Sequence, residues 1–301
     1  RLGTAVPPGS TMVVTLEPCN HHGRTPPCTE TLIESGIARV VIGATDPDPR
    51  VAGSGIARLV EAGIEVEAGI LSDIVERTDR AYFHHRRHGR PHITVKMATT
   101  LDGQTAALDG TSQWITSPET RQDAHRLRAS MDAVVVGAGT VRADDPLLTV
   151  RLAGYEGPQP VAVVVAGAHP LPLDARLWSR PETLVLSSTS LALPVETIMV
   201  EPGPDGRPSP QAVAAALGER GLLAVLLEGG ATLAGSFLAA GLVDAGVTYL
   251  APKLAGGAGI PSFQGNWRTL ADAVLVEIDA ATPVGADMRI DWTVGPVPIQ
   301  E

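Results

Sequence analysis

The chain is poor in aromatic side chains and in long apolar runs. Phe, Trp and Tyr make up 3% of its 301 residues while the hydrophobic class makes up 44%, so the core must consist mainly of Ala, Val, Leu and Ile. No apolar run approaches the about 18 to 20 residues that a membrane-spanning helix needs, and no signal-peptide core is present. We therefore expect a cytoplasmic protein that has no membrane partner.

Basic residues are also in the minority. The chain has 23 Lys and Arg against 33 Asp and Glu, which gives a formal net charge of −10. Binding to nucleic acid needs a net basic face, so this balance argues against a nucleic-acid partner. An anionic substrate would instead require a local cluster of basic side chains.

Glycine and proline are frequent, with 32 and 25 residues, and they separate many short segments. That composition is typical of an alternating α/β protein. A chain of 301 residues also exceeds the usual size of one hydrophobic core, so two domains are expected.

Cysteine is nearly absent, and the two that occur, Cys19 and Cys28, share one loop with three prolines. The loop follows an apolar run at residues 11–16, which predicts a strand. Two thiols in a chain of this length indicate a reducing compartment. On spacing alone, they could be zinc ligands or ordinary free thiols.

The motif from Pro18 to Cys28, Pro-Cys-x-His-x-Gly-x-Thr-Pro-Pro-Cys, resembles the deaminase half of the bifunctional riboflavin-biosynthesis deaminase/reductase. The resemblance implies that Cys19 and Cys28 bind zinc in a cytidine-deaminase-like domain. Nucleobase deaminases also need an upstream His-x-Glu, which supplies the third zinc ligand and the proton shuttle. Residues 1–16 contain neither His nor Glu, so the zinc site is incomplete in this chain.

Three nearby residues are candidate substitutes. Glu17 belongs, in this family, to the Glu-Pro-Cys motif without being the shuttle, and His21 and His22 are better explained as outer contacts or solvated side chains. We therefore expect a deaminase part that is inactive as supplied. A chain that lacks the front of a longer protein, and a natural reductase with a degenerate deaminase-like domain, both fit the sequence.

The rest of the first domain alternates helices and strands. We expect helices at residues 29–35, 55–62 and 71–87, and strands at residues 39–44 and 64–67. Gly89-Arg90-Pro91 then interrupts the pattern, which places the domain boundary there: residues 1–89 form the partial deaminase domain and residues 90–301 the second domain.

The second domain begins with a strand at residues 92–98 and a helix that opens at Pro118, with Ser117 as its N-cap. Arg121, His125 and Arg128 recur at helical spacing, so one face of this helix is cationic. Further strands are expected at residues 133–136, 160–166, 183–187, 197–200, 223–227, 272–279 and 287–294, with helices at residues 210–220 and from near residue 232.

Several motifs in this half occur in the order found in the reductase half of the same family. They are Lys96 to Gly103, Trp114 to Ser117, His125 to Ala129, Gly137 to Val141, Asp144 to Arg151 and Glu228 to Thr232. Gly137-Ala138-Gly139 lacks the third glycine of the Rossmann fingerprint, whose place Arg142 takes. The resemblance instead implies an α/β domain similar in fold to dihydrofolate reductase.

The resemblance also implies the reaction and its site. NADPH would reduce the ribose of 5-amino-6-(5-phosphoribosylamino)uracil to a ribityl chain, as a step of riboflavin biosynthesis. Motif by motif, the substrate would be bound by Ser112, Arg128, Leu148, Arg151 and Glu228, and NADPH by Ala98, Trp114, Thr140, Asp144, Gly230, Ala231 and Thr232. Asp144 or water would be the proton donor. Lys96 is not counted among the site residues, because a lysine on a strand usually has a structural role. The family alone also suggests a homo-oligomer.

A third hypothesis needs no deaminase at all. The cysteine loop would be a structural metal or interaction module, and the second half would only bind nucleotides. Zinc content and NADPH turnover distinguish this hypothesis from the first two.

Overall fold

The computed structural model describes residues 6–23, 25–265 and 267–295, and the chain divides into two compact units between Gly89 and Arg90. Among its described residues, the first unit has three strands and four helices: β1 (Thr11–Leu16), α1 (Cys28–Glu34), β2 (Arg39–Ala44), α2 (Ser54–Glu61), β3 (Glu65–Ala68), α3 (Ser72–Thr78) and α4 (Arg80–His88). The strands form a parallel sheet in the order β1-β2-β3.

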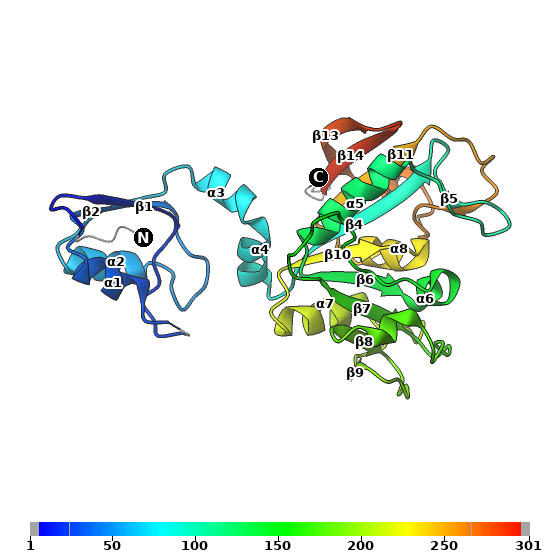
Figure 1. Ribbon diagram of the computed structural model, residues 1–301, viewed down its shortest axis with the longest axis horizontal. Helices are drawn as coiled ribbons and strands as arrows, with labels where there is room; N and C mark the ends of the chain where they lie inside the picture. The colour runs from blue at the N-terminus through cyan, green and yellow to red at the C-terminus, as the bar shows by residue number, and fades with distance from the viewer. Residues whose placement is uncertain (1–5, 24, 266, 296–301) are drawn as a thin grey trace. The chain divides into compact units, whose positions relative to one another are not determined.

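Helices cover both faces of this small sheet. Helices α1 and α2 lie together on one face (Figure 1), where Leu32 and Leu59 pack with Val40 and Ile42 of β2. On the other face a Cβ at Gly43 would lie 2.7 Å from Cγ2 of Val75 in α3. The unit is thus a three-layer α/β arrangement.

The predicted helix at residues 71–87 is two helices. The backbone of Asp79 leaves the helical region, and its carbonyl accepts hydrogen bonds from the amides of Tyr82 and Phe83. Asp79 therefore ends α3 and begins α4, and the continuous helix was a wrong prediction.

The second unit contains the remaining elements. Its strands are β4 (His92–Thr100), β5 (Gln104–Ala106), β6 (Ala133–Gly137), β7 (Val161–Ala166), β8 (Thr183–Ser187), β9 (Glu196–Met199), β10 (Ala224–Glu228), β11 (Ala245–Ala251), β12 (Ile260–Pro261), β13 (Val276–Val284) and β14 (Asp287–Val294). Its α-helices are α5 (Pro118–Ala129), α6 (Ala138–Asp144), α7 (Pro210–Glu219) and α8 (Ala231–Ala239), with 3₁₀ turns at Arg176–Ser179 and Leu270–Asp272.

Nine of these strands form one sheet, in the order β13-β14-β11-β4-β10-β6-β7-β8-β9. Strands β4 and β6 to β11 run parallel, and the β13–β14 hairpin is antiparallel at one edge. Strands β10 and β6 are buried along nearly their whole length, as the continuous apolar runs predict. The last strand pair begins at Val276, later than the predicted residue 272.

The two faces of the large sheet have separate cores. Val95 and Leu227 point toward α7 and α8, whose Leu217 and Phe237 complete one core. Val134 and Leu226 point to the opposite face, where α6 and the 3₁₀ turn at Arg176–Ser179 pack. Within the described residues, no helix has the length and apolarity to cross a membrane.

Candidate active site

The carboxyl ends of β4, β10 and β6 meet at one edge of the large sheet, where open α/β sheets usually bind ligands. Lys96 of β4 is the register partner of Glu228 at the end of β10. Since its neighbours Val95 and Met97 point into the core shared with α7 and α8, Lys96 points to the other face, which α5 covers. The candidate site begins with these two opposite charges.

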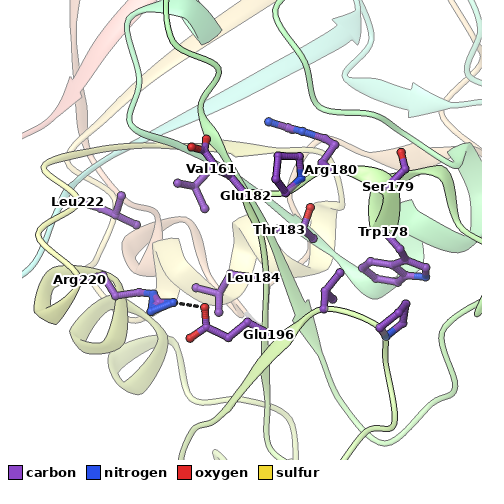
Figure 2. Close-up of a pocket in the computed structure, with 13 residues that line it drawn as sticks. Val161, Trp178, Ser179, Arg180, Glu182, Thr183, Leu184, Glu196, Arg220 and Leu222 are labelled. Atoms are coloured by element: carbon purple, nitrogen blue, oxygen red, sulfur yellow. Dashed lines mark hydrogen bonds and ion pairs between the residues drawn. The ribbon is translucent and has the colours of Figure 1, made fainter.

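A pocket of about 810 Å³ lies at the amino ends of three strands of the large sheet (Figure 2). It is lined by Val161, Thr183 and Glu196, which are the first residues of β7, β8 and β9. Because these strands are parallel, the pocket lies at their amino ends, whereas the Arg128–Glu228 contact lies at the carboxyl end of β10.

Arg128 and Glu228 form a buried ion pair between α5 and β10. Arg128 donates from Nε and Nη2 to the two carboxylate oxygens of Glu228, each at 2.9 Å, and each side chain is 11% exposed. Burial alone would raise the pKa of the Glu228 carboxyl, but the charges of Arg128 and Lys96 outweigh it and lower that pKa to about 2. The pair is therefore ionised at neutral pH.

The loop of residues 147–151 lies against this pair and carries Leu148 and Arg151. Nη1 of Arg128 donates to the carbonyl of Thr149 at 2.6 Å, and the amide of Arg151 donates to Nδ1 of His125 at 3.3 Å. Leu148 is buried, and its φ of 53° is a left-handed conformation that a leucine seldom adopts. These contacts hold the loop in one backbone conformation beside the Arg128–Glu228 pair.

Positive charge exceeds negative charge in this cluster. Lys96, Arg128 and Arg151 carry three positive charges against one on Glu228, a net charge of +2. Burial, followed by the charges of Arg128 and Arg151, lowers the pKa of His125 to about 4, so the imidazole is neutral at neutral pH. In the described chain, the Arg151 guanidinium has no hydrogen bond or ion pair. A free cation in a net positive cluster suits an anion.

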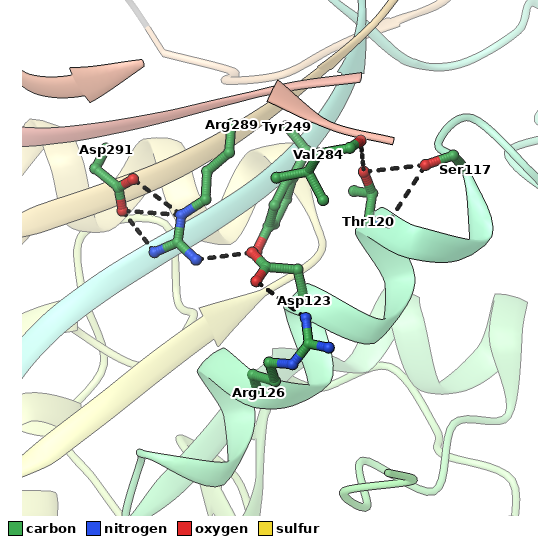
Figure 3. Close-up of polar contacts among 8 residues, drawn as sticks. All are labelled: Ser117, Thr120, Asp123, Arg126, Tyr249, Val284, Arg289 and Asp291. Carbon is green, nitrogen blue, oxygen red and sulfur yellow. Dashed lines mark hydrogen bonds and ion pairs between the residues drawn. The ribbon is translucent and has the colours of Figure 1, made fainter. Parts of the chain in front are cut away.

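Helix α5 is fixed to the sheet by a second polar network (Figure 3). Oδ2 of Asp123 accepts hydrogen bonds from the hydroxyl of Tyr249 and from Nη1 of Arg289, both at 2.7 Å, and Arg289 also pairs with Asp291. At the start of the helix, Ser117 caps the amide of Thr120, as predicted. The network sets the position of α5 and hence of Arg128.

A turn of two glycines follows Glu228 and leads into α8. Gly229 and Gly230 have φ values of 77° and 81°, which favour glycine, and a Cβ at Gly229 would lie 3.3 Å from Oγ1 of Thr140 on α6. The first amides of α8, from Ala231 and Thr232, have no acceptor within the helix. The glycine backbone, the hydroxyl of Thr140 and the N-terminus of α8 together fit a phosphate-bearing cofactor such as NADPH.

The other predicted site residues lie on α6, on β4 and in the loop that precedes α5. Asp144 ends α6, where the surrounding protein removes enough water to raise the pKa of its carboxyl above the ordinary value of 3.8. Ser112 and Trp114 line a small pocket of about 140 Å³. The Trp114 ring is exposed, and Cζ of Arg121 lies over it, 4.4 Å from the ring centroid. Ala98 lies on β4 two residues beyond Lys96.

Two members of the charged cluster were not selected from the sequence. A lysine on a strand usually has a structural role, so the sequence does not single out Lys96, and it marks His125 only as part of a cationic helix face. The spacing of His125 and Arg128, i and i+3, was the available signal, since it places both on one side of α5. The register of Lys96 with Glu228 could not be read from the sequence.

The cysteine loop brings the two predicted metal ligands together. The Sγ atoms of Cys19 and Cys28 are 3.5 Å apart, and the amide of Cys28 donates to Sγ of Cys19 at 3.4 Å. Among residues 6–23, 25–265 and 267–295, however, no group of three His, Cys, Asp or Glu side chains could hold a metal ion. The described residues thus supply two ligands, which do not make a catalytic zinc site, and we derive no reaction step from this loop.

Glu17 has a structural role beside this loop. Its buried carboxylate accepts hydrogen bonds from the amides of Asp46, Gly53, Gly55 and Ile56, at 2.9 to 3.2 Å. These amides belong to the segment that leads from β2 into α2. The carboxylate therefore holds that segment against the end of β1.

Replacing Glu17 by Ala should destabilise the first unit by about 3 kcal/mol or more, because it leaves several buried amides without an acceptor. Hydrogen exchange at residues 45–57 is the measurement, and these amides should lose most of their protection. Glu30→Gln, a change at an exposed glutamate of α1, is the matched control and should leave exchange unchanged. Equal exchange in the Glu17 variant and the wild type would contradict the assigned role.

Comparison with known proteins shows which proteins the chain is similar to. A family model for the RibD C-terminal domain matches residues 91–288. The riboflavin biosynthesis protein RibD of Mycobacterium tuberculosis is 42% identical over 284 residues, which cover 94% of this chain and 78% of the relative.

Two solved structures have the same fold over almost the whole chain. RibD of Acinetobacter baumannii, form 2, matches with a TM-score of 0.86 and 34% identity, over 96% of this chain and 81% of that one. A diaminohydroxyphosphoribosylaminopyrimidine deaminase/5-amino-6-(5-phosphoribosylamino)uracil reductase from Thermotoga maritima matches with a TM-score of 0.85 and 32% identity, over 96% and 80%. The predicted α/β fold class and family resemblance are both confirmed, and the chain belongs to the RibD family of riboflavin-biosynthesis proteins.

Proposed function

We propose that this chain reduces the ribose of 5-amino-6-(5-phosphoribosylamino)uracil to the ribityl form with NADPH. The observation that carries the proposal is the net positive cluster of Lys96, Arg128, Arg151 and Glu228, which adjoins the glycine turn and the N-terminus of α8. The charged cluster suits the phosphate of a sugar substrate, and the glycine turn with the N-terminus of α8 suits a nucleotide cofactor. Their adjacency is what a hydride transfer between two such molecules requires.

The substrate phosphate would bind to Arg151 and Arg128. The Arg151 guanidinium is available for a bidentate contact. Arg128 uses three of its five N–H groups on Glu228 and Thr149, which leaves two for a ligand. Leu148, Glu228 and Ser112 would line the same substrate site.

NADPH would lie along the carboxyl ends of β6 and β10. The amides of Gly230, Ala231 and Thr232 and the hydroxyl of Thr140 would hold its phosphates, and Ala98, Trp114 and Asp144 would line the remainder of the cofactor site. When bound, NADPH supplies the hydride. The residues of the chain align the sugar carbon with it and neutralise the substrate phosphate.

Asp144 or water would donate the proton. Partial removal of water raises the pKa of the Asp144 carboxyl, which favours its protonated form relative to an ordinary aspartate. The carboxyl also lies at the end of α6, the helix that carries Thr140. The position suits a group that serves the cofactor site.

For residues 1–89 we propose a partial zinc deaminase domain, in front of a reductase domain at residues 90–301. Its support is the Cys19–Cys28 pair at the start of α1 in a three-layer α/β unit. A monofunctional reductase with a degenerate deaminase-like domain is the alternative. The structural role of Glu17 is compatible with both and does not separate them. Free thiols and use of NADPH both suit the cytoplasm.

The test follows NADPH oxidation by this chain with two substrates in parallel. One is 5-amino-6-(5-phosphoribosylamino)uracil, and the other is its undeaminated pyrimidine precursor. We expect oxidation only with the first, with the ribityl compound as product. Oxidation with neither would overturn the reductase proposal, and oxidation with both would contradict an inactive deaminase part. Zinc content of the purified chain separates a structural metal module from a partial deaminase.

A further inference from the structure

The backbone of the 147–151 loop belongs to no helix or strand, and side chains hold it in place. Within the described residues, its backbone forms hydrogen bonds with the side chains of Arg128, His125, Gln159 and Arg180. No backbone-to-backbone hydrogen bond to these five residues occurs in that part of the chain. The conformation that presents Arg151 therefore depends on a few side chains.

Arg180 contacts the start of the loop. Its Nη1 donates to the carbonyl of Leu147 at 2.9 Å and its Nη2 to the carbonyl of Pro160 at 2.6 Å. The residue is 9% exposed, so these bonds form in a largely desolvated setting. The guanidinium thus ties the start of the loop to the residue that precedes β7.

Gln159 holds the other end of the loop. Its Oε1 accepts from the amide of Val150 at 2.7 Å, and its Nε2 donates to the carbonyl of the same residue at 3.4 Å. One side chain thus satisfies both backbone groups of Val150, as a neighbouring strand would. Val150 directly precedes Arg151.

We propose that Arg180 and Gln159 are positioning residues, which fix the 147–151 loop so that Arg151 faces the substrate phosphate. The inference rests on the proposed function. Between the two anchors lies Leu148 in its left-handed conformation, which an unanchored chain would leave. Loss of either anchor should release the loop without removing any group that touches substrate or cofactor.

The pocket at the amino ends of β7 to β9 provides a specific test. Arg180 lines this pocket beside Trp178 and Thr183 (Figure 2), so a shortened side chain would leave a space that opens into it. A small guanidinium ion could then enter and take the place of the missing group. Arg220, which lines the same pocket and pairs with Glu196, makes no contact with the loop and offers a matched control.

The experiment compares wild type, Arg180→Ala, Gln159→Met and Arg220→Ala in two measurements. In hydrogen exchange, the peptide that spans the loop should exchange faster in Arg180→Ala and Gln159→Met, and at the wild-type rate in Arg220→Ala. In steady-state kinetics, the same two variants should raise KM for the phosphorylated aminouracil about tenfold or more, since a displaced Arg151 would lose its charge-assisted hydrogen bonds to the substrate phosphate. Their kcat and the Kd for NADPH should change less than about threefold, because no group in contact with the cofactor is removed.

Methylguanidinium, at concentrations that leave the wild type folded, should restore slow exchange and low KM to Arg180→Ala and have no such effect on Gln159→Met. Unchanged loop exchange in both anchor variants would overturn the inference, as would an equal rise in KM for Arg220→Ala. If wild type itself fails to turn over the substrate, the proposed function fails. The exchange measurement still decides the positioning role in that case.

Discussion

Arg151→Met should lower kcat/KM for the phosphorylated aminouracil by a factor of about 100 to 1,000. Arg151 is the cation of the cluster whose guanidinium has no partner within the described residues, so its N–H groups can be used fully by the phosphate. A bidentate contact between Arg and phosphate contributes about 3 to 4 kcal/mol, which corresponds to that range. Steady-state kinetics with varied substrate at saturating NADPH is the measurement.

Three comparisons separate this effect from a general loss of structure. Arg151→Lys should keep part of the activity, because lysine retains the charge but not the planar fork. Arg126→Met removes the same charge from an exposed position of α5 and should leave kcat/KM within about twofold. The Kd for NADPH should be unchanged in all three variants. A loss of less than fivefold for Arg151→Met would contradict its place in the phosphate site.

Arg128→Met should destabilise the second unit by about 3 to 5 kcal/mol and abolish measurable turnover. The change leaves the Glu228 carboxylate buried without its bidentate partner, which is the costly way to break a buried ion pair. Denaturant unfolding followed by tryptophan fluorescence is a suitable measurement, because all four tryptophans lie within residues 90–301. The transition therefore reports on this unit alone.

The double variant Arg128→Met/Glu228→Leu is the control for that prediction. It removes both charges, so most of the lost stability should return while activity stays absent. A double variant as unstable as Arg128→Met would mean that the packing of Arg128, and not the pair, stabilises the unit. A loss below about 1 kcal/mol in the single variant would contradict the pair altogether.

The same pair predicts a dependence on pH. The folded state lowers the pKa of Glu228 from 4.5 to about 2, so its contribution to stability is complete above pH 4.5 and is lost as the pH falls toward 2. In Arg128→Met the carboxyl is buried without its guanidinium, which raises its pKa. The difference in stability between wild type and variant should therefore be largest at neutral pH and become smaller in acid.

Much of the fold could be predicted from local signals. The apolar runs of β6, β7 and β10 mark buried parallel strands, and Ser117 followed by Pro118 marks the start of α5. The break at Asp79 and the short helix α6 were missed. Asp79 lies within a continuous helical pattern, and Gly137 and Gly139 make residues 137–140 look like a turn.

The candidate site could be predicted in its members but not in its contacts. Arg128 and Glu228 were both selected, yet they are 100 positions apart, and only the order of strands and the placement of α5 make them partners. The same holds for Gln159 and Arg180, which are ordinary residues in sequence and become anchors of the 147–151 loop only in the folded chain. Tertiary contacts of this kind leave no periodic pattern.

The central claim is that the cluster of Lys96, Arg128, Arg151 and Glu228 binds the phosphate of the sugar that NADPH reduces. The most direct test measures kcat/KM for NADPH oxidation with 5-amino-6-(5-phosphoribosylamino)uracil and with its dephosphorylated analogue, in wild type and in Arg151→Met. We expect wild type to prefer the phosphorylated substrate by a factor of about 100 or more, and the variant to lose most of that preference. Equal rates with the two substrates in wild type, or an undiminished preference in the variant, would contradict the account.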